Sequence, residues 1–189
     1  GSHLLEHNSI ALPHRLKNAA GLNRKLQGIG LLGSVLQYYA TRTGPMAGGP
    51  FEVGAFARSS PDVDRPDFQI YVGAFTFDRS DENYPVPLDT PEKEPGFTIF
   101  AQMLRPTSEG TVMITSIDPA APLKIEPNWL ATEEDRVKAV TMVKYLRKFV
   151  RQPALSAYVG EELAPGTKFQ SNEEILRAFR RLSSSGLHA

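Results

Sequence analysis

Apolar and polar residues alternate through the middle of the chain, which is the pattern of strands with one buried face. Positions 51–57 and 68–74 alternate in this way, and a short strand is expected earlier, at 9–12. Two later runs, 97–105 and 111–116, flank a short loop that contains proline and glycine. The sequence therefore predicts that these two runs pair with each other as a β-hairpin.

Helical periodicity marks residues 22–40 and the last third of the chain. Three glycines inside 22–40 predict a break near its middle, because glycine disfavours a helix interior. Thr132 opens an imperfect capping box, and the apolar stripe behind it ends before Pro153. Ser171 opens a more regular capping box, and the helix that follows it is expected to end at Gly186.

Strands first and helices later predict an α+β fold, with an antiparallel (mixed) β-sheet packed against helices on one side. Between the strands, residues 78–96 hold four prolines and six acids. This composition is too polar and too rich in proline to pack, so a long mobile loop is predicted.

Composition narrows the class of protein. The chain has 189 residues, equal numbers of acidic and basic side chains and no cysteine. The absence of cysteine excludes disulfide bonds and thiolate chemistry. Because the net charge is zero, the chain as a whole has no positive electrostatic potential that would attract nucleic acid or an anionic membrane. No apolar run reaches the length of a transmembrane segment. Residues 1–3 are interpreted as a tag remnant, and the chain is expected to be a piece of a longer protein.

Several segments, in order along nearly all of residues 4–189, resemble the glucose–methanol–choline (GMC) oxidoreductases. The pieces that carry the resemblance are Leu4-Leu5-Glu6-His7, Gly44-Pro45, Pro50-Phe51-Glu52-Val53-Gly54-Ala55-Phe56, Arg65-Pro66-Asp67-Phe68-Gln69, Leu104-Arg105-Pro106 with Ser108, Gly110 and Val112, Asp118-Pro119, Pro127-Asn128-Trp129-Leu130, Gln152-Pro153-Ala154-Leu155 and Glu162-Leu163-Ala164-Pro165-Gly166.

The resemblance implies a flavin-binding Rossmann-like domain followed by a substrate domain. Residues 4–189 correspond to the second domain, so FAD is expected in the full-length parent and not in this fragment. The implied activity is oxidation of a small alcohol to an aldehyde or ketone by hydride transfer to flavin, in the cytoplasm. The isolated fragment is expected to be inactive.

The same resemblance assigns catalysis to His188, as the base that accepts the alcohol proton. A histidine suits this role because its ordinary pKa, about 6.5, allows proton transfer near neutral pH. Leu187 and Glu52 are the candidate substrate-binding residues. The chain ends at Ala189, so the rest of the family's His-x-x-Gly-Thr motif and its second histidine or asparagine are absent from this sequence.

Two further readings remain open for the function. The domain could bind without catalysing, as a pocket wall or an oligomer surface. It could also belong to lyase-like members of the family that cleave cyanohydrins. Because the flavin-binding partner domain is missing, an exposed apolar patch and self-association are expected.

Other motifs are given structural interpretations. Residues 28–33 read G-x-G-x-x-G, but a helical pattern precedes them instead of the strand that a dinucleotide loop needs. His7 and His14 are interpreted as structural or exposed, and no histidine spacing fits a metal site. The cluster Lys144, Arg147, Lys148 and Arg151 is interpreted as the solvated face of a helix.

Overall fold

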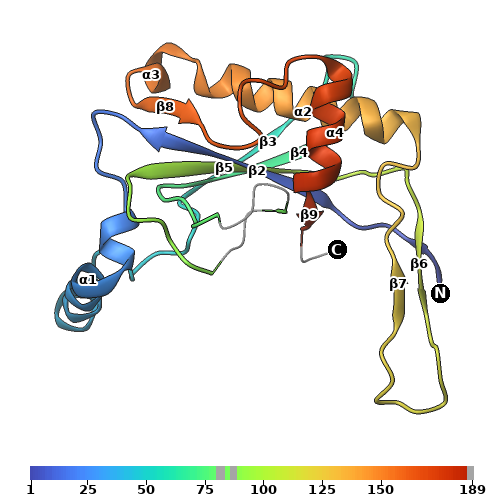
Figure 1. Cartoon of the computed structure of the whole chain (residues 1–189), viewed down its shortest axis with the longest axis horizontal. Coiled ribbons are helices and arrows are strands. Elements are labelled where there is room, and N and C mark those ends of the chain that lie inside the picture. The colour runs from blue at the N-terminus through green and yellow to red at the C-terminus, as the bar shows by residue number, and fades with distance from the viewer. Residues whose placement is uncertain (80–83, 86–88, 187–189) are drawn as a thin grey trace.

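A six-stranded antiparallel sheet organises the part of the chain that the computed structural model describes, residues 1–79, 84–85 and 89–186 (Figure 1). Its strands follow the order β3-β4-β5-β2-β8, and β9 extends the sheet by pairing with β2. The strands are β2 (Asn8–Leu16), β3 (Val53–Ala57), β4 (Phe68–Gly73), β5 (Gly96–Met103), β8 (Val159–Glu162) and β9 (Ser184–Ser185).

One face of this sheet forms the core. Alternation along β2 and β5 turns Ile10, Leu12 and Ile99 to the same side, where all three are buried. Helices α2 (Glu133–Val150) and α4 (Asn172–Leu182) cover that side in Figure 1, and short α3 (Pro153–Ser156) follows α2. The predicted α+β fold, with helices on one side of an antiparallel sheet, is confirmed.

Both predicted capping boxes lie at helix starts, but only one is complete. Ser171 accepts a hydrogen bond from the Glu174 amide, and the Glu174 side chain accepts one from the Ser171 amide in return. Thr132 accepts from the Asp135 amide at 3.2 Å. The Asp135 carboxylate instead accepts hydrogen bonds from the Thr107 and Ser108 amides. Asp135 thus ties residues 107–108 to the start of α2.

The end of α4 differs from the prediction. The helix ends at Leu182, four residues before Gly186, and Ser183 already has extended backbone. The cause is non-local, because Ser184 and Ser185 form β9 against β2 and strand pairing requires extended backbone. Gly186 does not adopt the left-handed conformation that a helix-terminating glycine would need.

The predicted hairpin between 97–105 and 111–116 is wrong. Both edges of β5 are occupied by β2 and β4, so no edge remains for a partner that follows it. The chain instead leaves the sheet and forms β6 (Gly110–Met113), which pairs with β7 (Lys124–Glu126) and with β1 (Ser2–Leu4). These three strands form the arm that projects from one end of the molecule in Figure 1.

The segment 22–40 divides into 3₁₀ helix η1 (Asn23–Leu26) and α1 (Gly28–Thr41). The predicted break exists but lies at Gln27, whose backbone is extended. A Cβ on Gly30 would stand 1.9 Å from the Arg24 carbonyl oxygen, so this glycine permits close packing of α1 on η1. Because η1 and not a strand precedes the G-x-G-x-x-G motif, the interpretation against a dinucleotide loop is confirmed.

Candidate functional site

The sheet face opposite α2 and α4 carries the strongest candidate site, an aromatic and amide surface on β4 and β5. Tyr71 and Phe100 are direct cross-strand neighbours. The Phe51 ring packs on them, with centroid distances of 5.4 Å to Tyr71 and 5.0 Å to Phe100. Burial raises the pKa of the Tyr71 phenol above its ordinary value. These rings provide an apolar wall with one hydroxyl group.

An amide pair borders the aromatic surface. Gln69 and Gln102 are cross-strand neighbours one row along the same face, and the Gln102 side-chain nitrogen donates to the Gln69 side-chain oxygen at 2.8 Å. Gln102 is buried, at 3% exposure. A buried amide in the middle of an antiparallel sheet requires hydrogen-bonding partners, so this row is fixed in orientation.

The C-terminal segment crosses this row. The Gly186 amide donates to the His7 carbonyl at 2.8 Å. The Ser9 hydroxyl donates to the Ser184 carbonyl at 3.1 Å. A Cβ on Gly186 would lie 2.7 Å from the Gln102 side-chain oxygen, so glycine allows the chain to pass against the amide pair. The segment that leads to the predicted catalytic residue is therefore anchored on the open face.

The residues predicted from the sequence are not brought together in the described structure. Leu187 and His188 lie outside the described residues, so their roles stay predictions. Glu52 is exposed and lies just before β3, at the edge of the sheet. Val53, the next residue, is two strands across and three residues along from Gln102, which strand spacing makes ~14 Å. A substrate contact for Glu52 also stays a prediction.

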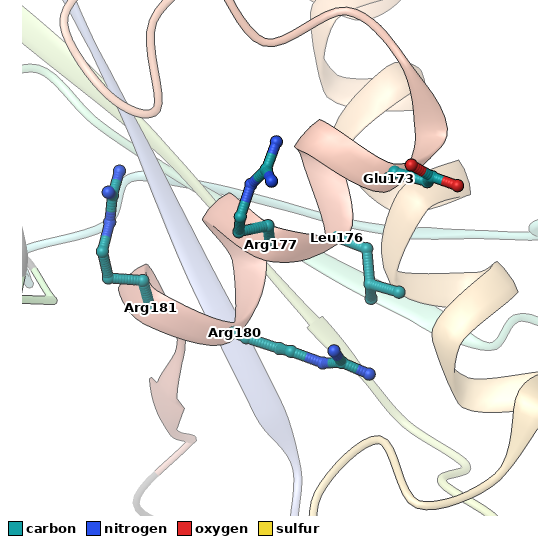
Figure 2. Close-up of a pocket in the computed structure, with 5 residues that line it drawn as sticks. All are labelled: Glu173, Leu176, Arg177, Arg180 and Arg181. Carbon is teal, nitrogen blue, oxygen red and sulfur yellow. The ribbon is translucent and has the colours of Figure 1, made fainter.

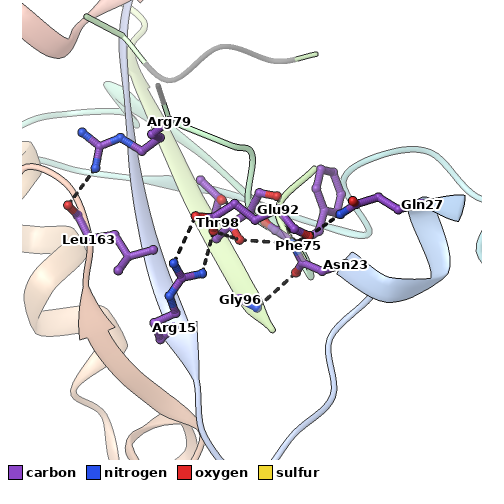
Figure 3. A network of polar contacts seen from close by, with 10 residues as sticks. Arg15, Asn23, Gln27, Phe75, Arg79, Glu92, Gly96, Thr98 and Leu163 are labelled. Carbon is purple, nitrogen blue, oxygen red and sulfur yellow. Dashed lines mark hydrogen bonds and ion pairs between the residues drawn. The ribbon is translucent and has the colours of Figure 1, made fainter. Parts of the chain in front are cut away.

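A polar network centred on Glu92 fixes the ends of the proline-rich segment (Figure 3). Arg15 on β2 donates two hydrogen bonds to the Glu92 carboxylate, at 2.6 and 3.0 Å. The Thr76 hydroxyl donates a third at 2.6 Å. The carboxylate is largely buried, with 15% of its side chain exposed. Charge-assisted bonds of this kind are about twice as strong as neutral ones.

Asn23 completes the network from η1. Its side-chain nitrogen donates to the carbonyls of Thr76 (3.0 Å) and Glu92 (2.9 Å), and its side-chain oxygen accepts from the Gly96 amide at 3.1 Å. The expectation that 78–96 is too polar to pack is therefore wrong at its C-terminal end, because Glu92 is held by hydrogen bonds from Arg15, Thr76 and Asn23. Residues 80–83 and 86–88 lie outside the described residues, and mobility of this segment stays a prediction.

The covered side of the sheet holds a buried ionic cluster that corrects one sequence interpretation. Arg147 is 6% exposed and forms a bidentate pair with Glu162 at 2.8 and 2.9 Å, so it does not belong to a solvated helix face. Burial lowers the pKa of the adjacent His14 even though Glu162 opposes this effect. The His14 ring stacks on Phe97 at 5.1 Å, which confirms a structural histidine.

A hollow lies on the outside of α4 and is lined by Arg177, Arg180 and Arg181 with Glu173 and Leu176 (Figure 2). Arg180 extends on the side of Leu176, whereas Arg177 and Arg181 extend away from it. Guanidinium groups that diverge cannot chelate one anion. Within the described ranges, no cluster of acidic and histidine side chains could hold a metal ion, and no helix could span a membrane.

Sequence reasoning missed the amide pair, Gly186 and Glu92. A signal existed for Gln69 and Gln102, because each is a polar residue between two apolar residues inside a predicted strand. The Glu92 network had no local signal, since its partners come from β2, η1 and the strand ends.

The comparisons with known proteins agree with this geometry. Residues 106–189 match the family model described as GMC oxidoreductase. An oxygen-dependent choline dehydrogenase of Staphylococcus aureus (strain JH9) is 29% identical over 188 residues, which cover 100% of this chain and 32% of that protein.

Two solved structures share the fold. A formate oxidase of Aspergillus oryzae RIB40 superposes with a TM-score of 0.82 at 19% identity, over 100% of this chain and 36% of that chain. A fungal aryl-alcohol oxidase gives 0.70 at 14% identity, over 100% and 38%. The chain thus spans about a third of the length of these proteins. The resemblance stated from the sequence is confirmed.

Proposed function

We propose that this chain, which corresponds to the C-terminal, substrate-binding region of GMC oxidoreductases, forms the substrate wall of an FAD-dependent enzyme that oxidises an alcohol. The supporting observation is the course of the C-terminal segment. It passes Gln102 at Gly186, beside the aromatic surface of Phe51, Tyr71 and Phe100. A wall of this kind binds the apolar body of an alcohol and leaves its hydroxyl group to polar partners.

His188 is proposed as the general base. It takes the hydroxyl proton of the alcohol while the hydride of the carbinol carbon leaves, so that the carbon–oxygen bond becomes a carbonyl. FAD, when bound, supplies the hydride acceptor. The His7 carbonyl and the Ser9 hydroxyl hold the segment that approaches this base. Leu187 and Glu52 are proposed to contact the substrate.

Binding of FAD is assigned to the part of the longer relatives that this chain does not cover. In the described residues, no glycine loop follows a strand and opens a helix, which is the arrangement that holds a pyrophosphate. The isolated chain is therefore expected to be colourless and inactive, and an absorption spectrum with a flavin band after purification would contradict this assignment.

The test is anaerobic flavin reduction by simple alcohols in the full-length protein, followed by stopped flow. Replacement of His188 by Ala is expected to slow reduction by ~10²–10⁴-fold while FAD stays bound, because a positioned base acts in the transition state. His14→Gln, on the covered side of the sheet, is the control and should leave the rate unchanged below its unfolding temperature.

The outcomes separate the competing functions. An unchanged rate in the His188 variant would refute the catalytic assignment. Absence of flavin reduction by any alcohol in the unaltered protein would favour a binding or oligomerisation domain. Cleavage of a cyanohydrin without flavin reduction would indicate a lyase.

A further inference from the structure

Helix α1 exposes an apolar stripe that the domain itself does not cover. Ile29, Leu32, Leu36 and Tyr39 recur at helical spacing, and Ile29 is 90% and Tyr39 70% exposed. In Figure 1 the helix lies outside the two layers, at the end of the molecule opposite the β6–β7 arm. Its main contact in the described structure is η1. Large exposed apolar stripes of this kind mark sites of interaction.

The charged residues in the sequence around this helix are all positive. No residue of α1 is charged, and no acidic residue occurs between Glu6 and Glu52. Five basic residues lie in that interval: Arg15, Lys17, Arg24, Lys25 and Arg42. Of these, Arg15 alone forms an ion pair in the described part of the chain. The zero net charge of the whole sequence hides this asymmetry, because the rest of the chain is net acidic.

Both ends of the stripe carry cations and amphipathic side chains. At the C-terminal end the Arg42 guanidinium lies over the Tyr38 and Tyr39 rings, 5.2 and 5.7 Å from their centroids. At the N-terminal end a hollow is lined by Arg24, Gln27, Gly28, Lys93 and Glu94. The helix N-terminus there has no side-chain cap, so its first amide groups are available to an anion.

We propose that α1 attaches this protein to the surface of an anionic phospholipid membrane. The stripe enters the boundary between headgroups and acyl chains, Tyr39 lies at headgroup level, and Arg24, Lys25 and Arg42 face lipid phosphates. A 14-residue helix is about 21 Å long, shorter than the ~30 Å hydrocarbon core, so it lies in the interface and does not cross the bilayer.

The charge pattern favours lipid over a second copy of the chain. A symmetric contact between two α1 helices would bring the unpaired Arg24, Lys25 and Arg42 groups of both copies to one interface. Glu94 lines the hollow beside Arg24, but Lys93 lines it too, so this one acid does not neutralise the three cations. An anionic leaflet neutralises these cations and at the same time accepts the apolar stripe.

Flotation with vesicles tests the proposal on this chain and on the full-length protein. Binding by this chain but not by the full-length protein would show that the stripe packs against the flavin-binding domain, and it would overturn the proposal. Unaltered protein is expected to float with phosphatidylcholine vesicles that contain phosphatidylglycerol, and much less with pure phosphatidylcholine. Ile29→Glu/Leu36→Glu should reduce binding by at least about ten-fold, since each side chain loses its apolar burial. Arg24→Gln, Lys25→Gln and Arg42→Gln should each reduce binding to anionic vesicles by roughly five-fold.

Ile114→Glu/Ile117→Glu, in the arm, is the matched control, because both isoleucines are also highly exposed. It should bind like the unaltered protein. Equal loss in this control, or equal binding to neutral and anionic vesicles, would overturn the proposal. So would absence of vesicle binding together with a dimer, by light scattering, that Ile29→Glu/Leu36→Glu converts to monomer. Unchanged circular dichroism in each variant shows that the fold is intact.

Discussion

Replacement of Glu162 by Gln should expose how strongly the covered side of the sheet depends on one ion pair. Both side chains of the pair are almost completely buried, with 7% of Arg147 and 4% of Glu162 exposed. The Arg147 guanidinium also donates to the Phe169 and Gly166 carbonyls, at 2.7 and 3.0 Å. It therefore joins α2, β8 and the loop between β8 and α4.

The magnitude follows from the charge that is left behind. Removal of one partner of a buried pair typically costs 3–5 kcal/mol, because the remaining charge is uncompensated. Glutamine has nearly the same shape as glutamate and keeps one oxygen that can accept a hydrogen bond from Arg147. Glu162→Gln should therefore lower the free energy of unfolding by about 3 kcal/mol, the low end of this range. That is a large share of the ~5–15 kcal/mol that stabilises a typical domain.

Urea denaturation followed by circular dichroism measures this loss as a lower midpoint, by more than about 1 M. Glu133→Gln is the matched control, since Glu133 pairs with Arg136 on the same helix but 76% of its side chain is exposed. An exposed pair contributes at most ~1 kcal/mol, so the control should shift the midpoint little. If both variants lose the same small amount, the burial of the Arg147 pair does not stabilise the fold as argued.

Two further predictions concern pH and the anchor of the arm. Burial lowers the pKa of His14 in the folded state below its ordinary 6.5, so the unfolded chain binds the proton more readily and stability should fall as pH drops below about 6.5. His14→Phe should flatten this dependence in thermal melts across that range, and an unchanged slope would contradict the assignment. Burial alone would raise the pKa of Asp135, but hydrogen bonds from Ser108 and Thr107 outweigh it and lower the pKa. The ionised Asp135 carboxylate therefore stabilises the folded state fully above its ordinary pKa of 3.8. This stabilisation is lost as the pH falls through the lower pKa of the folded state. Asp135→Ala should cost about 2 kcal/mol at neutral pH and almost nothing in strong acid, measured by urea titration at both pH values.

Elements with local signals were predicted well from the sequence. The apolar stripe and the Thr132 cap fix α2, and the capping box at Ser171 fixes the start of α4. Strand-like sequence patterns located β2 to β6, but the short strands β1, β7, β8 and β9 were not predicted. The pairing partners of the strands were not predicted, because pairing depends on residues that are far away in the chain. The edges of β5 are filled by β2 and β4, and the sequence around 106–110 does not reveal this.

The burial of Arg147 could have been predicted from the sequence, although the residue was interpreted as part of a solvated helix face. Position 147 lies four residues after Val143 and three before Val150, so it falls on the apolar stripe of α2. A charged residue on such a stripe predicts a buried partner, and Glu162 is that partner. The open face was harder to predict, since Gly186 reaches Gln102 only after α4 ends early and β9 forms.

The central position of β2 has a consequence for the order in which the domain is made. Its residues leave the ribosome before those of its neighbours β5, β8 and β9, which it contacts through pairs such as Ile10 with Ala101 and Ser9 with Ser184. The β3-β4-β5 meander can form in chain order, because each strand follows its partner. Long-range pairing of this kind is slow and leaves edges exposed. Until residues 159–185 have emerged, at least one edge of β2 is unpaired, and an unpaired strand edge favours aggregation of the nascent chain.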